Sequence, residues 1–375
     1  MPTAYTPGLT VTGDTRIRKV RRLPMKGQVL VEAGQHVQAE TVVARAELPG
    51  PLTNIKASEK LGIEPNELPS AMRVSVGDRV ERDQLLAELK SFFGIFHNEL
   101  RSPVEGVIEH ISELSGYVGI RQPSVPINTD AYISGVIEEV LPEQGAVITA
   151  RGAFIEGIFG VGGERRGMLK VLAASPDVHL SATQLSDDLR GMLIVGGAGA
   201  DAAALQRAAK VGVAGVIVGA VTDSDLRALV GYDIGVAITG HEDIPMTLIL
   251  TEGFGTLPIS QHTFELLQSL DGKQASFNGA TQIRAGVIRP EIIVPRDGDD
   301  GPAPERAEVV GTELVIGSRV RVIREPYFGQ LSKVTALPPE LQEIATGAKV
   351  RVAELMLDSG ERTVVPRANL EILRD

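Results

Sequence analysis

The sequence predicts a multidomain protein that combines one α/β module with all-β modules. Between Gly191 and Leu270, short apolar runs alternate with helix patterns, which is typical of a three-layer α/β module built on parallel strands. Before residue 150, two pairs of self-similar segments carry alternating apolar residues, which predicts small β modules. A charged stretch rich in glycine and proline, from Arg296 to Glu305, separates a final group of short strands.

The overall composition restricts the classes of function. The net charge of −11 should repel nucleic acid and anionic membranes unless one domain carries a local basic patch. No run approaches the ~18 consecutive apolar residues of a membrane helix, and the N-terminus lacks a basic region followed by an apolar one. The absence of cysteine excludes disulfides, thiolate metal sites and thiol catalysis. We therefore expect a cytoplasmic, bacterial-type protein without membrane insertion.

The N-terminal part contains two interleaved repeats of short β units. In the first pair, Val31, Gly34, Val37, Val42, Val43 and Ala44 recur 43 residues later as Val74, Gly77, Val80, Leu85, Leu86 and Ala87. In the second pair, Gly106-Val-Ile-Glu109, Ile111, Gly116 and Val118 recur 29 residues later as Gly135-Val-Ile-Glu138, Val140, Gly145 and Val147. Each unit alternates apolar residues at period two and turns at a glycine, which predicts short, bent strands in a small barrel or sandwich.

The middle of this part resembles a known fold. The resemblance rests on Val76-Gly-Asp-Arg-Val80, Gln84-Leu-Leu-Ala87 and Ser102-Pro-Val-Glu-Gly106. Their order is similar to the barrel-sandwich hybrid fold of biotinyl and lipoyl carrier domains and of their unmodified relatives in the RnfC family. The resemblance covers about residues 20–150 with interruptions. We expect one β domain over residues 15–150, with an inserted arm at residues 50–72 that contains a helix from Thr53 to Leu61.

The carrier function of that family is not expected here. Carrier domains present a modifiable lysine at a hairpin tip, and Phe93 stands in that place, whereas Lys90 lies three residues early. We therefore expect an unmodified polypeptide. The apolar tip formed by Phe92, Phe93 and Phe96 is expected to pack against another domain of the chain or to contact a partner protein.

The central module, residues 151–295, is expected to contain four parallel strands at residues 192–195, 214–218, 234–238 and 246–250. The helices between them have clear end signals, because Gly212 and Gly231 suit left-handed caps, and Thr222 and Ser260 suit N-caps. Further strands at residues 274–278, 283–288 and 291–294 are expected to pair with strands near residues 147–173. The glycine-rich stretch 152–167, with its two arginines, suits either tight bends or an anion site, and we favour the bends.

Any small ligand of this module is expected at the carboxyl ends of its strands. Loops that follow parallel strands converge on one edge of a sheet, where helix N-termini suit anions. The ligand-binding candidates at this edge are Gly197, Gly199, Thr222, Asp223, Glu242 and Glu252. The spacing of Gly197 and Gly199 formally fits a dinucleotide fingerprint, but a plain turn explains it better because the second strand does not end in an acid. No histidine has metal-ligand spacing, and we expect neither a cofactor nor a resident metal. If an anionic ligand does bind at this edge, the two nearby acids favour a hydroxyl-bearing ligand or a bridging Mg²⁺.

The C-terminal part, residues 309–375, follows a linker at residues 296–308. It contains Gly317-Ser-Arg-Val-Arg-Val-Ile-Arg-Glu-Pro-Tyr-Phe-Gly329, Val334, Lys349-Val-Arg-Val352, Gly360 and Thr363-Val-Val-Pro-Arg-Ala-Asn369. These segments resemble the KOW motif and SH3-like barrel of the NusG family and of several ribosomal proteins, with a departure from the motif at Ser332. That resemblance implies contacts with RNA or protein. Residues 312–375 hold nine basic and nine acidic residues, so we expect a protein contact through Tyr327 and Phe328 rather than RNA binding.

Three functional hypotheses follow from these patterns. The first is a non-enzymatic binding or scaffold protein that acts through protein partners or self-association. The second is an enzyme or small-ligand sensor that uses the carboxyl-end loops of the central sheet. The third is a transcription- or ribosome-associated factor that acts through the C-terminal part, which its neutral charge disfavours.

Overall fold

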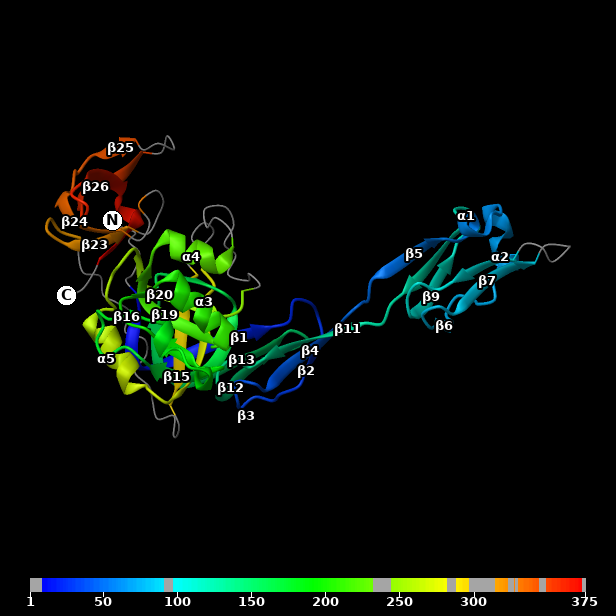
Figure 1. Cartoon of the computed structure of the whole chain (residues 1–375), viewed down its shortest axis with the longest axis horizontal. Helices are drawn as coiled ribbons and strands as arrows, with labels where there is room; N and C mark the ends of the chain where they lie inside the picture. Colours follow the sequence, from blue (N-terminus) through cyan, green and yellow to red (C-terminus); the bar gives the residue numbers. More distant parts are fainter. Residues whose placement is uncertain are drawn as a thin grey trace.

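The computed structural model shows a mostly β protein with three visibly separate parts (Figure 1). It describes residues 9–90, 97–231, 244–281, 288–296, 314–322, 327, 330–343 and 349–372. A body contains the helices α3, α4 and α5, and a long arm extends from it to a small β module. Residues 314–372, which we call the C-terminal module, lie against the opposite end of the body. In the described ranges, no helix has the length and apolar character needed to cross a membrane.

One large mixed sheet forms the body. Its strands follow the order β14 (Phe159–Val161), β20 (Thr247–Phe254), β19 (Gly215–Val221), β17 (Leu193–Val195), β15 (Glu164–Val171), β21 (Gln274–Asn278), β22 (Glu291–Pro295), β13 (Gly145–Glu156), β12 (Gly135–Leu141) and β3 (His36–Val37). In addition, β1 (Val11–Arg22) pairs with β13, and β16 (His179–Leu180) pairs with β18 (Gly199–Ala200). The sheet is therefore larger than a four-stranded central module.

The parallel core of this sheet agrees with the sequence pattern. β15, β17, β19 and β20 run parallel to one another, which confirms three of the four expected strands. The fourth, at residues 234–238, lies outside the described residues. Two of the three expected flanking strands are also confirmed, because β21 pairs with β15 and β22 pairs with β13. The third, expected at residues 283–288, lies almost wholly outside the described residues. These flanking pairs are antiparallel, so the whole sheet is mixed.

The helices of the body begin and end where the local sequence signals stand. α3 (Ala202–Val211) ends at Gly212, whose φ of 81° is left-handed, and α4 (Asp223–Val230) begins after the N-cap Thr222. α5 (Gln261–Ser269) begins after Ser260, whose side chain accepts a hydrogen bond from the backbone of Thr263. The turn at Gly196 and Gly197 leads into the short strand β18 (Gly199–Ala200), which precedes α3, so this turn does not lead directly into the helix.

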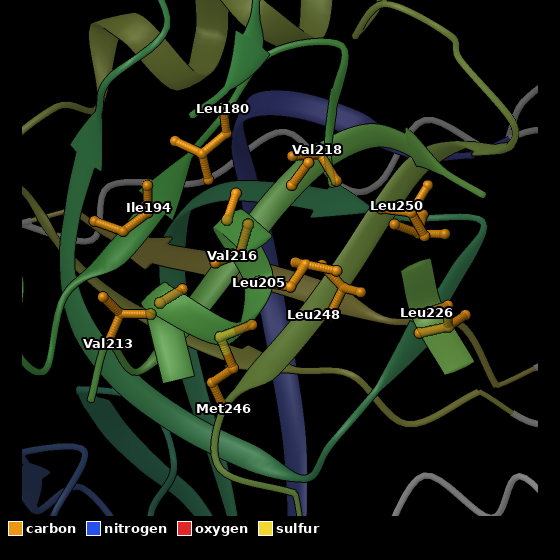
Figure 2. Packing of buried hydrophobic residues seen from close by; sticks show 14 of the residues in the cluster. Leu180, Ile194, Leu205, Val213, Val216, Val218, Leu226, Met246, Leu248 and Leu250 are labelled. Carbon is orange, nitrogen blue, oxygen red and sulfur yellow. The ribbon is translucent and has the colours of Figure 1, made fainter. Parts of the chain in front are cut away.

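Two cores lie on the two faces of the sheet. On one face, Leu205 of α3 and Leu226 of α4 pack with Val216 and Leu248 of the strands (Figure 2). Burying each such side chain contributes about 1.5–3 kcal/mol. On the other face, Phe264 of α5 packs with residues of β13, β21 and β22 as well as with the parallel strands. The curled sheet and α5 together thus cover this face, in place of the helical third layer that the sequence predicts.

The N-terminal repeats belong to two modules, one inserted in the other. In the proximal module, β2 (Gln28–Val29), β4 (Val42–Leu48) and β11 (Val125–Asp130) form a separate three-stranded sheet, which shares one core with residues of β3, β12 and β13. The distal module contains β5 (Leu52–Lys56), α1 (Ala57–Leu61), a 3-10 turn (Pro65–Glu67), α2 (Leu68–Ala71), β6 (Arg79–Val80), β7 (Leu85–Lys90), β8 (His97–Arg101), β9 (Gly106–Ile111) and β10 (Tyr117–Arg121). Each module holds one copy of each repeated unit, and each has its own buried core.

The stretch at residues 50–72 therefore differs from the expected inserted arm. The helix prediction is wrong over residues 53–56, because this segment forms β5 and pairs with β10. The helix α1 begins only at Ala57 and ends at Gly62 in a left-handed conformation. Pairing with a neighbouring strand overrides a weak local helix preference. The inserted unit extends over the whole distal module, from β5 to β10 (Figure 1).

A short neck connects the two modules. The ladder between β4 and β11 ends at the pair Leu48 and Val125, and the ladder between β5 and β10 starts at the pair Leu52 and Arg121. Between them, a Cβ atom at Gly50 would lie 2.2 Å from the carbonyl oxygen of Gln122. The two segments of the neck, at residues 49–51 and 122–124, thus touch through their backbones, and only glycine fits this contact.

The C-terminal module is one curled sheet of short strands. It contains β23 (Arg319–Val322), β24 (Leu331–Ala336), β25 (Leu341–Glu343), β26 (Lys349–Leu357), β27 (Arg362–Pro366), a 3-10 turn (Arg367–Asn369) and β28 (Leu370–Ile372). Its core contains Val320, Val334, Leu355 and Leu370. All the ladders of this module are antiparallel.

Candidate functional site at the carboxyl edge of the sheet

The glycines of the expected ligand edge are buried under another segment. Gly197 and Gly199 follow β17, and both are buried. A Cβ atom at Gly197 would lie 2.2 Å from the carbonyl oxygen of Val178, and one at Gly199 would lie 2.9 Å from the His179 ring. The Val178 carbonyl oxygen and the His179 ring therefore lie directly against these two glycines. These glycines permit close chain packing, as a plain turn requires.

The two helix N-termini at this edge are occupied by side chains of the protein. Asp201 accepts a hydrogen bond from the backbone of Ala204. Asp225 joins the two helices, because its Oδ1 accepts from the backbone of Ala202 at 2.9 Å and its Oδ2 accepts from the Thr222 hydroxyl at 2.5 Å. These carboxylates stabilise the free N–H groups and the positive ends of the helix dipoles. An anionic ligand would have to displace them.

The acidic candidates do not converge on one point. Asp223 pairs with Arg227 on the exposed face of α4, at 2.8 Å. Glu242 lies outside the described residues. Glu252, on β20, accepts a hydrogen bond from the backbone of Ser260 at 3.0 Å and pairs with Arg321 at 2.9 Å. Of the two acids that the structure describes, Glu252 is the one in a contact between two parts of the molecule.

Glu252 belongs to a buried ionic cluster that joins the body to the C-terminal module. Arg321 of β23 and Glu371 of β28 are both 2% exposed in their side chains, and their charged atoms lie 3.4 Å apart. Glu371 also accepts a hydrogen bond from the backbone of Leu9 at 2.6 Å and lies 3.6 Å from Arg289. We call Glu252, Arg289, Arg321 and Glu371 the interface cluster. Its two positive and two negative side chains balance each other.

The burial of Arg321 has a simple structural cause. Val320 and Val322 point into the core of the C-terminal module, so Arg321 must point to the outside of its strand. That outside is covered by the body, which supplies Glu252 as a partner. The Nε atom of Arg321 remains buried without a hydrogen bond among the described residues. Burial of such charges is costly unless they are paired, so the cluster marks a fixed contact.

A second polar cluster holds the proximal module to the body. Arg21 of β1 binds the carboxylates of Asp130 and Glu164, at 3.2 and 2.6 Å. Arg166 binds Asp130 at 2.8 Å and donates to the carbonyl oxygen of Ala39 at 2.7 Å. Asp130 thus lies between two arginines, and the glycine-rich segment carries structural arginines rather than a free anion site.

Tyr132 is the least satisfied group of this second cluster. Its side chain is buried at 1% exposure, its backbone has a left-handed φ of 67°, and its ring lies 5.2 Å from the Arg21 guanidinium. The hydroxyl lies near the Glu291 carboxylate without the geometry of a normal hydrogen bond. Burial, followed by the charges of Glu291 and Glu164, raises the pKa of Tyr132 well above its usual value.

Replacing Tyr132 by phenylalanine is expected to leave stability unchanged or to raise it by about 1 kcal/mol at pH 7, because the variant removes a buried hydroxyl without a partner. Above pH 10 the difference should grow. The unfolded tyrosine loses its proton near its usual pKa of about 10, while the folded one keeps it, so stability of the parent falls as pH rises above 10, by at most about 1.4 kcal/mol per unit. Urea unfolding of both proteins at pH 7 and 10.5 measures this; a loss of stability in the variant at pH 7 would contradict it.

The remaining candidates lie partly outside the described residues. Phe92, Phe93, Phe96 and Phe328 are in the undescribed segments. Tyr327 is half-buried, packs against the core of the C-terminal module and donates a hydrogen bond to Glu361 at 3.4 Å. The described part of the chain brings together no group of three or more histidine, aspartate or glutamate side chains able to hold a metal ion.

Sequence reasoning missed the residues that organise both clusters. Arg321 and Glu371 were counted only as part of a balanced charge, and Tyr132 and Asp130 were not singled out. Asp225 was expected as the acid of a capping box with Thr222, and the structure confirms that contact, although its second bond, to the backbone of Ala202, was not expected. Comparison of the chain with protein-family models and with curated proteins finds no match to either.

Proposed function

We propose that this protein is a non-enzymatic binding or scaffold protein that holds its distal module away from the body as a recognition element. The observation that carries the proposal is the arrangement in Figure 1, where the distal module lies at the end of a neck made of two segments of the chain. The distal core and the proximal core have no residue in common. A module placed in this way exposes most of its faces to a partner.

The fine architecture supports the same role. In our proposal the proximal and distal modules are two barrel-sandwich hybrid units without a carrier lysine, and the C-terminal module is an SH3-like barrel of the KOW type. Domains of both kinds often serve as docking surfaces in other proteins. We further propose a cytoplasmic location and protein partners or self-association.

The contacts at the expected ligand edge favour binding over chemistry. Gly197 and Gly199 pack against residues 178–179, Thr222 and Asp225 cap helices, and Glu252 holds the C-terminal module. An enzyme needs groups that can reach a substrate. Each of these side chains is already engaged within the fold, so the enzyme or sensor hypothesis is the weaker alternative.

Removal of the distal module tests the proposal. β4 and β11 pair as far as Leu48 and Val125, so an Asn-Gly turn can replace residues 49–124 and close the ladder as a hairpin. We expect the shortened chain to keep the stability of the body and to lose the partner that native mass spectrometry finds on the full chain from its own host. Cross-links from that partner should map to the distal module, whose exposed Lys56 and Lys60 are suitable acceptors.

Other results would decide against this role. A partner retained in full by the shortened chain would remove the distal module as the recognition element. Turnover of a copurified small molecule would favour the enzyme hypothesis. Micromolar RNA binding by the full chain with a steep salt dependence would favour the transcription- or ribosome-associated hypothesis, whereas we expect no binding tighter than about 10⁻⁴ M at physiological salt.

A further inference from the structure

The strand β1 lies at an open edge of the large sheet. It is 12 residues long and pairs along its length with β13. In the described part of the chain, no strand pairs with its other side. Near its end, the Arg22 carbonyl oxygen accepts a weak hydrogen bond from Thr129, so the open edge extends from Thr15 to Val20. A free edge of this length can accept another strand.

The direction of the backbone groups on this edge follows from two contacts. The carbonyl oxygen of Arg151, opposite Arg16, accepts a hydrogen bond from the backbone of Arg296, so it points away from β1. A Cβ atom at Gly145 would lie 1.9 Å from the Arg21 carbonyl oxygen, so that oxygen points toward β13. Along an antiparallel strand, the backbone groups of successive residues point alternately toward the paired strand and away from it. The N–H and C=O groups of Arg16, Arg18 and Val20 therefore point to the open side.

The side chains beside this edge are suited to an extended segment. A shallow open groove is lined by residues 15–19 and Phe154. Thr15, which lines this groove, is 5% exposed. Its hydroxyl is buried and has no hydrogen-bond partner among the described residues. The side chains of Arg16 and Arg18 pair with Glu138 and Glu139 of β12 but stay about half exposed, at 52% and 49%, and Val20 is 45% exposed.

We propose that the open edge of β1 binds an extended acidic segment of a partner protein, which adds a strand beside residues 16–20. The strand would satisfy the free backbone groups, and its acidic side chains would lie opposite Arg16 and Arg18. This inference deepens the proposed binding role and rests on it. It names a second surface, on the body, that does not depend on the distal module.

Other occupants fit this edge less well. A second copy pairing through β1 in the antiparallel sense would bring arginines opposite arginines, and like charges across a ladder are destabilising. A nucleic acid lacks the alternating backbone donors and acceptors that a strand offers to an open edge. A peptide supplies both the backbone pattern and the charge.

The test uses a dye-labelled, end-blocked octapeptide of alternating glutamate and valine, with fluorescence anisotropy on the full chain. Arg18→Pro removes an N–H that points to the open edge without removing a bond to β13, so it should weaken binding about tenfold or more and leave the fold intact. The matched variant Arg18→Thr keeps the N–H and loses only the charge, so a loss of about two- to fivefold is expected. Hydrogen exchange should slow at Arg16, Arg18 and Val20 when the peptide binds.

Several outcomes would overturn the proposal. These are the absence of binding by the peptide, equal binding of a lysine–valine peptide, and equal affinities of the proline and threonine variants. A dimer that Arg18→Pro dissolves would assign the edge to a second copy. Tighter peptide binding after Asp297, Asp299 and Asp300 are changed to asparagine would assign it to the chain's own acidic linker. Since Arg18→Pro leaves the distal module unchanged, partner binding there tests the proposed function separately.

Discussion

Replacing Glu371 by alanine is expected to destabilise the C-terminal module by about 3 kcal/mol. The change leaves Arg321, at 2% exposure, with Glu252 as its one remaining partner in the interface cluster, and it removes the acceptor for the backbone N–H of Leu9. Removing one partner of a buried ion pair leaves an uncompensated charge, which costs more than the pair contributes. Hydrogen exchange across the module, measured in the full chain, reports the change in its local unfolding free energy.

Two further variants separate burial from charge. Glu354→Ala removes an exposed acid from the same sheet and should change stability by less than about 0.5 kcal/mol. The double variant Arg321→Met with Glu371→Leu replaces the ion pair by apolar side chains and should recover most of the loss. If Glu371→Ala behaves like Glu354→Ala, the interface cluster does not hold the two parts together.

The elements that the sequence predicts well depend on neighbours in the chain. The caps at Gly212, Thr222 and Ser260 were identifiable because a helix end is satisfied by residues within one turn. The parallel strands were identifiable because apolar runs of β-branched residues bounded by glycines suit a strand buried on both faces. The repeats also predicted β modules, since each copy alternates at period two.

The contacts that position the predicted ligand edge were not available to that reasoning. Glu252 is a candidate because it follows an expected strand, but its partner Arg321 lies 69 residues away in the sequence. The covering of Gly197 by Val178 depends on where the loop before β17 returns. Charge counting also fails for Arg321, because it treats every arginine as solvated, whereas docking between two parts of the chain buries this one.

The same limit applies to the arm. The sequence does not show which copies pack together. Residues 31–44 and residues 74–87 are similar, so either copy of this unit could pack with either copy of the second repeated unit. The structure pairs the inner copies in the distal module and the outer copies in the proximal module. Loop closure favours this nesting, since the inner copies are the closest in sequence. Because the inner copies lie between the outer copies in the sequence, the distal module is a separable unit that is joined to the rest by two segments of the chain.

Replacing Ile108 by alanine is expected to destabilise the distal module by about 2–5 kcal/mol and to leave the body unchanged. Ile108 lies on β9, is fully buried and packs in the distal core with Ile55 and Leu86. Loss of its side chain leaves a cavity that a small core cannot fill by rearrangement. Because no residue of the distal core belongs to another core, faster hydrogen exchange should be confined to residues 52–121.

The matched control is Ile133→Ala, which removes the same side chain from the proximal core. That core includes Ile148 of β13, so its damage should extend into the large sheet and lower the stability of the body. The two variants thus remove the same side chain, but the region that each is expected to destabilise differs. If Ile108→Ala also loosens β13, the neck transmits stability and the distal module is not an independent recognition element. If its effect stops at the neck, a partner can bind or reorder the distal module without disturbing the body.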